Sequence, residues 1–233
     1  MKVEEFVSRA KGIAKFPTCY LMGGYGCRIG KDWYNENYKW NKQHESIIKA
    51  HSNTDPITFG FDCVCLVKSI LWGFGGYPDK PYGGAQYASN NVPDCTIEYL
   101  AKHTTTSTDF DNIEVGELVF LNGYGHVGIY IGDGEVIEST PAWKCGVQKT
   151  LLPSRNTTNY DALPVRKWDF HGKCCFVEYG GVNYTQAYLK LQEKYADLEI
   201  RLNNSIKAQT ALEEQIVRLR EQINKAKEVL TSA

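Results

Sequence analysis

The chain has 233 residues, and its 26 lysine and arginine residues nearly balance its 27 aspartate and glutamate residues. Hydrophobic residues make up 42% and charged residues 23%, a globular composition that excludes a wholly disordered chain. The balanced charge argues against a nucleic-acid partner, and no apolar run is long enough for membrane insertion. The N-terminal residues lack the apolar core of a signal peptide, so we expect synthesis in the cytoplasm without export by that route.

A helix is expected over residues 3–15, because Phe6, Ala10 and Ile13 follow helical spacing. The next stretch, residues 18–26, is rich in glycine and in turn-forming residues.

Residues 31–58 are polar and aromatic, and they predict a loop with one helix near residues 45–51. A buried helix is then expected over residues 61–74. Five strands follow, at residues 117–121, 126–131, 135–139, 146–151 and 174–178. Helices followed by an antiparallel sheet predict an α+β domain over residues 1–181.

The buried helix begins with a cysteine that is a candidate nucleophile. Asp62 is a suitable N-cap, and Cys63 falls in the first turn, where unpaired N–H groups and the helix dipole favour a thiolate. The same N–H groups could hold an oxyanion. Cys65 is interpreted as a packing residue. An ordinary buried cysteine is the alternative for Cys63, and this segment alone favours that alternative.

Seven further cysteines are present, Cys19, Cys27, Cys65, Cys95, Cys145, Cys174 and Cys175. The spacing C-x-x-C does not occur, so the usual zinc-ligand pattern is missing and we expect no zinc site. Disulfide frameworks are typical of short secreted chains, and most of these cysteines are therefore predicted to be small buried apolar residues.

Residues 125–138 predict a β-hairpin whose register can be argued from burial. A two-residue turn would pair Tyr130 with Ile137, whereas a three-residue loop would pair Ile129 with Ile137 and Gly128 with Glu138. The second register gathers the apolar residues on one face and puts glycine where the loop requires a positive φ. Burial therefore favours the three-residue loop.

This register brings a histidine and a carboxylate together. His126, Gly128 and Glu138 share the polar face, with Glu138 opposite Gly128 and diagonal to His126. The absent side chain of Gly128 is expected to leave room for the carboxylate to reach the imidazole. A carboxylate on one ring nitrogen leaves the other free to accept a proton from a thiol. The alternative is a histidine on a solvated strand with a chance acidic neighbour.

From Tyr184 onward glycine and proline are absent, and apolar residues recur in a heptad pattern. One seam holds Tyr188, Tyr195, Leu202, Gln209, Ile216, Ile223 and Leu230; the other holds Tyr184, Leu191, Leu198, Ser205, Leu212, Leu219 and Ala226. A helix of roughly 70 Å is too long to bury this stripe on its own domain. Residues 182–233 therefore predict a coiled coil that mediates self-association, and a linker helix packing back on the domain is the alternative.

Four motifs together resemble the NlpC family of papain-like cell-wall peptidases and the related CHAP family. They are residues 20–26 (a tyrosine followed by two glycines), residues 61–67 (the nucleophile helix), residues 114–120 (the strand before the histidine) and residues 125–134 (the histidine strand). The resemblance covers residues 3–175 and implies a papain-like NlpC fold.

The resemblance implies roles for matching residues. Cys63 would be the nucleophile, His126 the general base and Glu138 the third residue, where many NlpC members have histidine. Tyr20 and Asp62 would lie on the substrate and oxyanion side of the site. Trp143 could wall the groove, although a buried core tryptophan is equally consistent with the sequence. Val64 and Cys65 replace the small residues that often follow the nucleophile, and the insert at residues 27–61 departs from the compact form.

The resemblance implies a peptidoglycan hydrolase that cleaves an amide of the stem peptide without a metal or cofactor. It further implies action at the bacterial cell wall in phage lysis or as a virion component. The alternatives are an assembly protein whose papain-like domain only binds the wall, and an N-acetylmuramoyl-L-alanine amidase or acyltransferase on the same scaffold. The intact Cys63, His126 and Glu138 argue against a purely structural role.

Overall fold

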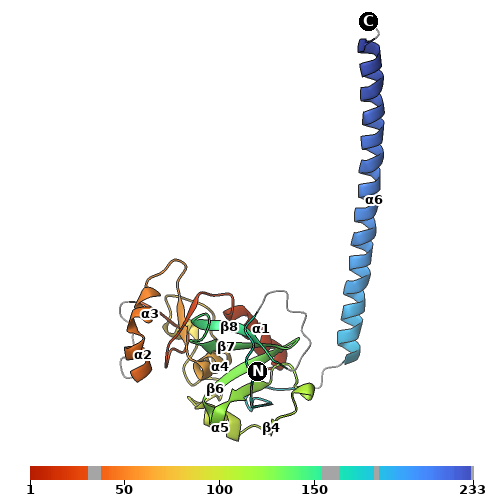
Figure 1. Ribbon diagram of the computed structural model, residues 1–233. Helices are drawn as coiled ribbons and strands as arrows, with labels where there is room; N and C mark the ends of the chain where they lie inside the picture. Colours follow the sequence, from red (N-terminus) through yellow and green to blue (C-terminus); the bar gives the residue numbers. More distant parts are fainter. Residues whose placement is uncertain (31–37, 154–162, 181–183, 232–233) are drawn as a thin grey trace. The chain divides into compact units, whose positions relative to one another are not determined.

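The computed structural model describes residues 1–30, 38–153, 163–180 and 184–231. The chain divides into two compact units, Met1–Gly180 and Gly181–Ala233, and each is considered by itself (Figure 1). Within the described ranges, none of the helices combines the length and the apolar character that crossing a membrane requires.

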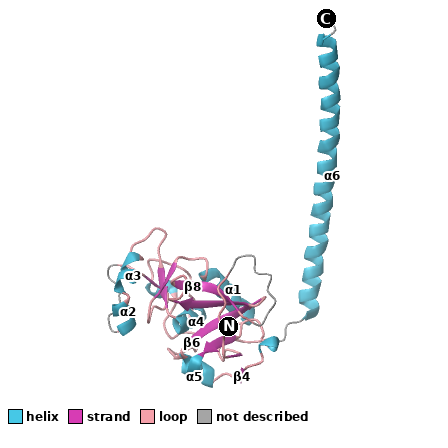
Figure 2. Cartoon of the chain, in the orientation of Figure 1, coloured by secondary structure: helices cyan, strands magenta, loops and turns pink. Residues whose placement is uncertain are grey.

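The first unit is a mixed α+β domain, as predicted (Figure 2). Helix α1 (Val3–Ile13) buries the side of the helix that carries Phe6, Ala10 and Ile13, which confirms the predicted spacing. Helix α4 (Cys63–Leu71) is buried along almost its whole length. The other helices are α2 (Lys39–Gln43), α3 (Glu45–Ala50), α5 (Ile97–Lys102) and the short 3-10 helices η1 (Pro81–Gly84), η2 (Phe110–Asn112) and η3 (Asn122–Tyr124).

A six-stranded antiparallel sheet forms the centre of this unit, in the order β4-β9-β5-β6-β7-β8. Its strands are β4 (Thr106–Ser107), β5 (Leu118–Leu121), β6 (His126–Gly132), β7 (Glu135–Thr140), β8 (Gly146–Leu151) and β9 (Phe170–Gly172). Gly128 pairs with Glu138 and Ile129 with Ile137, so the register that burial predicted is confirmed.

Apolar side chains cover both faces of this sheet. Val127, Ile129 and Ile137 belong to the main core, which α1 and α4 close from one side (Figures 1 and 2). Trp168 and Val136 belong to a smaller core that gathers different sheet residues. Because strand side chains alternate between faces, a residue next to Val127 along β6 points away from the main core.

The prediction of a strand over residues 174–178 is wrong. Those residues form a turn, held by Tyr179, whose hydroxyl accepts from the N–H of Cys174 at 2.9 Å and donates to the carbonyl of Gly116 at 2.7 Å. The place beside β5 is taken instead by Phe170–Gly172. The strand that pairs with β5 therefore lies before the apolar residues 174–178 that were predicted to form it.

A second, three-stranded sheet was not predicted. It contains β1 (Thr18–Tyr20), β2 (Cys27–Arg28) and β3 (Phe59–Phe61), with β1 parallel and β2 antiparallel to the central β3. Strands this short do not establish an alternating pattern in the sequence. The sheet is important for the site because β1 ends at Tyr20 and β3 leads directly into α4.

The second unit contains one helix, α6 (Tyr184–Thr231), which confirms the predicted helical segment. The apolar heptad side chains that the structure describes are exposed, from Ile216 at 48% to Leu230 at 78%. Their pairing with another helix stays a prediction.

Candidate active site

Cys63 is the first residue of α4, and Asp62 caps the helix as predicted. The Asp62 carboxylate accepts from the N–H of Cys65 at 2.7 Å and from the N–H of Gly23 at 2.8 Å. The thiol of Cys65 also donates to this carboxylate at 3.1 Å. Cys65 thus helps to fix the cap, and Asp62 joins α4 to the glycine-rich segment after β1.

Cys63 itself is 5% exposed. Burial raises the pKa of its thiol to about 12, and the negative charge of Asp62 acts in the same direction. The N–H groups of Val127, Val64 and Cys63 lower the pKa without compensating for burial. The N–H groups at the helix start thus act in the expected direction, but burial and the charge of Asp62 outweigh them. A base must remove the proton from this thiol before it can attack.

His126 and Glu138 form the predicted pair across the hairpin. Nε2 of His126 lies 2.6 Å from Oε2 of Glu138, and the histidine side chain is 13% exposed. Nε2 is therefore engaged, and Nδ1 is the nitrogen left to exchange a proton. The N–H of Val127, the next residue along β6, is directed at the Cys63 thiol. The cysteine is thus brought to the end of β6 that carries His126, while direct contact between sulfur and imidazole stays a prediction.

Two further side chains, neither of which was predicted, hold the Glu138 carboxylate. The Thr150 hydroxyl donates to Oε1 at 2.7 Å, and Nε of Arg166 donates to the same oxygen at 2.8 Å. Burial alone would raise the pKa of Glu138, but the hydrogen bonds from His126, Thr150 and Arg166 outweigh it and lower that pKa. The carboxylate is therefore kept charged in a site where it is fully buried.

A tryptophan positions the imidazole from a second direction. The ring of Trp168 stacks on His126, with centroids 5.6 Å apart and planes within 7°. A β-carbon added at Gly128 would lie 2.7 Å from Val136 and 3.0 Å from Trp168. The expectation that Gly128 leaves room for Glu138 therefore needs correction, because its nearest neighbours are the indole ring and Val136.

Tyr20 is the last residue of β1, and its hydroxyl donates to Sδ of Met22 at 3.4 Å. Burial raises the pKa of this hydroxyl, and Cys63 and Asp62 act in the same direction. The insert predicted at residues 27–61 holds this segment in place. Asn41 of α2 makes two hydrogen bonds with the backbone of Met22, at 3.0 and 3.1 Å, and Trp40 packs edge-on against Tyr20.

A pocket of about 480 Å³ is lined by Asp62 and Val64, the residues before and after Cys63 in the sequence. Its wall also contains the ion pair of Lys68 and Asp94, whose carboxylate accepts from two tyrosine hydroxyls as well. Trp143 is 57% exposed and lines a different pocket, of about 760 Å³. Trp143 is therefore not a buried core tryptophan, which was the alternative prediction for this residue.

A second histidine–glutamate pair was not predicted. Nδ1 of His171 lies 2.5 Å from Glu117, and Nε2 lies 2.9 Å from the carbonyl oxygen of Asp109. Both ring nitrogens are therefore engaged, so this histidine has none left to serve as a base. Within the described ranges, no group of three or more His, Cys, Asp or Glu side chains is arranged to hold a metal ion.

The solved structures that the chain resembles include the following two. One is the peptidoglycan hydrolase RipB (Rv1478) from Mycobacterium tuberculosis, with 18% identity and a TM-score of 0.41; the alignment covers 76% of this chain and 65% of that one. The other is the P60 domain of antigen MAP1204 from M. avium subspecies paratuberculosis, with 18% identity, a TM-score of 0.38 and coverage of 76% and 96%. A search of curated proteins found no match.

A family model described as NlpC/P60 matches residues 35–159. This range contains Cys63, His126 and Glu138, and it begins after Tyr20. The match agrees with the resemblance carried by the sequence motifs. Since it spans more than half of the residues, the chain belongs to the NlpC/P60 family.

Proposed function

We propose that this protein is a cysteine peptidase that hydrolyses an amide bond in the stem peptide of peptidoglycan. Members of the NlpC/P60 family are cysteine-type peptidoglycan endopeptidases, and the family membership supports this reaction class. The observation that supports the proposal is the 2.6 Å contact between Nε2 of His126 and the buried Glu138, and we assign the remaining nitrogen, Nδ1, to the Cys63 thiol.

The reaction begins with a neutral thiol. Nδ1 of His126 accepts the proton of Cys63 as the sulfur attacks the carbonyl carbon of the substrate amide. The carbonyl oxygen takes the electron pair, and N–H groups of the first turn of α4, which have no carbonyl partner within the helix, stabilise the oxyanion. The Tyr20 hydroxyl is the second donor that we assign to this oxygen.

The imidazolium then returns its proton to the leaving nitrogen, and the C–N bond breaks. Glu138 stabilises the imidazolium through this step, because its negative charge lies directly against Nε2. A water molecule, deprotonated by the neutral His126, attacks the thioester and releases the acid product and the free thiol. The proton count is balanced, and no cofactor enters the sequence of steps.

The 480 Å³ pocket is the proposed seat of the residues next to the cleaved bond. Its charged lining combines Asp62, Asp94 and Glu98 with one lysine, Lys68. Lys68 and Asp94 form an ion pair, Asp62 is buried as the cap of α4, and Glu98 is paired with Lys102, so the charges of this lining are largely compensated.

The test uses purified cell walls and the full-length protein. Wild-type protein is expected to reduce wall turbidity, and mass spectrometry of the released fragments identifies the cleaved bond. Cys63→Ala is expected to abolish release, whereas Cys175→Ser, at an exposed cysteine, is expected to retain it. Full release by Cys63→Ala would reject the assignment of the nucleophile.

The same variant separates hydrolysis from binding. A wall-binding assembly protein would sediment with walls and release no fragments, both as wild type and as Cys63→Ala. An amidase or acyltransferase would give a different fragment mass. We further propose that α6 assembles the protein through its heptad seams, and that the protein reaches the wall by phage-mediated release or as a virion component.

A further inference from the structure

We propose that Cys19 and Cys145 form a thiol modification site, at which a small-molecule disulfide of the glutathione type converts the two thiols into an intramolecular disulfide. The bond would join β1 to the connection between β7 and β8. The inference goes beyond the proposed function and does not depend on it, because neither cysteine takes part in the proposed reaction.

The two sulfur atoms are already neighbours. Sγ of Cys19 and Sγ of Cys145 lie 3.4 Å apart, although 126 positions separate the residues in the sequence. Both carry free thiols. The backbones are also fixed beside each other, since the hydroxyl of Thr18 accepts from the N–H of Val147 at 2.8 Å. A disulfide of about 2.05 Å needs only a small approach of the two side chains.

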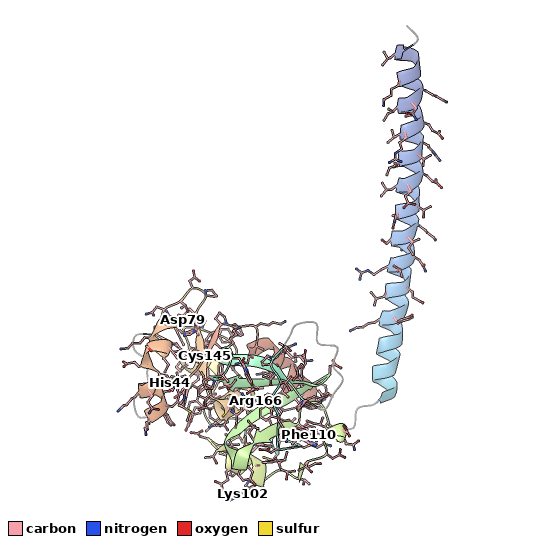
Figure 3. All side chains as sticks on the ribbon, in the orientation of Figure 1. His44, Asp79, Lys102, Phe110, Cys145 and Arg166 are labelled. Carbon is pink, nitrogen blue, oxygen red and sulfur yellow. The ribbon has the colours of Figure 1, made fainter. Side chains whose placement is uncertain are left out.

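The surroundings make the two thiols unequal. Cys145 is partly exposed, and Figure 3 labels it among the side chains of the first unit. Its Sγ accepts from the N–H of Tyr20 at 3.2 Å. A hydrogen bond from Cys19 lowers the pKa of Cys145 to about 6 against the effect of burial, and the N–H of Tyr20 and the nearby His51 and His44 act in the same direction.

Cys19 has the opposite character. It is fully buried, and its thiol also lies 3.6 Å from the carbonyl oxygen of Tyr20. Its hydrogen bond to Cys145, together with burial, raises its pKa. Cys145 is therefore the sulfur that an external reagent reaches, and Cys19 is the sulfur that completes the exchange.

The chemistry proceeds in two balanced steps. The Cys145 thiolate attacks one sulfur of glutathione disulfide, which breaks the S–S bond and releases one glutathione thiolate. Cys19 then loses its proton to that thiolate or to solvent, and its sulfur attacks Cys145 in the mixed disulfide. A second glutathione leaves, so one glutathione disulfide is reduced for each protein disulfide formed.

The experiment uses the reduced full-length protein and glutathione disulfide as the probe. After incubation, free thiols are blocked and the protein is digested and analysed by mass spectrometry. Wild-type protein is expected to give a linked peptide containing Cys19 and Cys145. Cys19→Ser is expected to stop at one glutathione on Cys145, and Cys145→Ser is expected to leave Cys19 unmodified because Cys19 is buried.

Cys174 and Cys175 provide the matched control. They are adjacent in the sequence, and Cys175 is exposed, so it reacts with the same reagent. The double variant C174S/C175S is expected to form the Cys19–Cys145 link unchanged. Wild-type protein that carries glutathione on Cys145 while Cys19 stays free, or that leaves Cys145 unmodified, would overturn the proposal.

A stability measurement gives a second readout. Closing a loop of this length constrains the unfolded chain, so oxidation is expected to raise the thermal midpoint of wild-type protein by roughly 5–10 °C. A thiol reductant should reverse the shift, and Cys145→Ser should show none. A linked peptide without any shift would retain the modification site but reject its stabilising effect.

Discussion

Glu138 is the residue on which the orientation of the candidate base depends. Its carboxylate binds His126 through one oxygen and both Thr150 and Arg166 through the other (Figure 3 labels Arg166). A histidine at this position could orient His126, but it could not pair with Arg166 in the same way. The carboxylate and the arginine are therefore best understood as one unit that keeps a negative charge beside the imidazole.

Replacing this charge tests the unit. Glu138→Gln retains the shape of the side chain but removes the charge that stabilises the imidazolium, and we expect wall hydrolysis to fall roughly 100-fold or more. The rate of turbidity loss measures the effect. Because a buried carboxylate is being altered, thermal unfolding of the same sample must accompany the assay.

Glu117→Gln is the matched control for that variant. Glu117 is also buried and also bound to a histidine, His171, but it lies outside the candidate site. We expect Glu117→Gln to cost stability while its hydrolysis rate stays within a few-fold of wild type. Equal losses of rate in the two variants would mean that the Glu138 effect is one of stability alone.

The protonation state of Cys63 can be tested through its reactivity. Since its pKa is raised to about 12, the thiol is neutral in the resting protein, and deprotonation increases as pH rises toward that value. We expect its alkylation rate by iodoacetamide to keep rising up to about pH 10. Peptide mapping separates this reaction from those of the other cysteines.

Cys175 serves as the internal standard for that experiment. It is exposed, and a hydrogen bond from Cys174 lowers its pKa to about 7. Its alkylation rate should therefore level off about one pH unit above neutrality. A Cys63 rate that is already flat near pH 7 would show a preformed thiolate and would contradict the neutral resting state.

At the scale of the elements, the hairpin of β6 and β7 carries the base and its carboxylate. Its register could be predicted because only one pairing buries Ile129 and Ile137 together, and a shift by one residue would expose them. The meeting of His126 and Glu138 followed from that register. This part of the site therefore depends on local sequence alone.

The remaining partners could not be predicted, for physical reasons. Arg166 and Trp168 lie outside the hairpin and near no recognisable motif, so only the tertiary fold brings Arg166 to Glu138 and Trp168 to His126. The effect of burial on the Cys63 pKa also depends on the complete fold. The small sheet escaped prediction because strands of two or three residues have no measurable period.

Gly128 links the hairpin to the tryptophan beneath the imidazole. In Gly128→Ala the new methyl group would lie 2.7 Å from Val136 and 3.0 Å from Trp168, so these side chains must shift. We expect a loss of about 1–3 kcal/mol in the free energy of unfolding, together with slower wall hydrolysis. Urea unfolding and the turbidity assay measure the two effects.

Gly12→Ala is the control for this substitution. Gly12 lies within α1, and nothing occupies the space that its β-carbon would fill. The alanine should stabilise the protein by roughly 0.5–1 kcal/mol and leave hydrolysis unchanged. If Gly128→Ala is equally harmless, the stacking of Trp168 on His126 does not depend on the absence of that methyl group.

At the scale of the whole molecule, α6 differs from the catalytic unit because its apolar side chains are exposed. Ile216 and Ile223 lie on one heptad seam and are 48% and 54% exposed. Val217 is exposed to the same extent as Ile223, but it lies outside both seams. Assembly through the seams would bury the isoleucines and leave Val217 in solvent.

The double variant I216D/I223D is therefore expected to convert an oligomer into a monomer, whereas Val217→Asp should leave the oligomer intact. Analytical ultracentrifugation of the full-length proteins measures the difference. Several copies of the first unit on one assembly would hold a wall by avidity, so we expect I216D/I223D to lose activity on walls while its hydrolysis of a soluble stem peptide is unchanged. A monomeric wild-type protein would reject the coiled coil, and so would equal effects of I216D/I223D and Val217→Asp. The exposed apolar stripe of α6 would then bind a different partner.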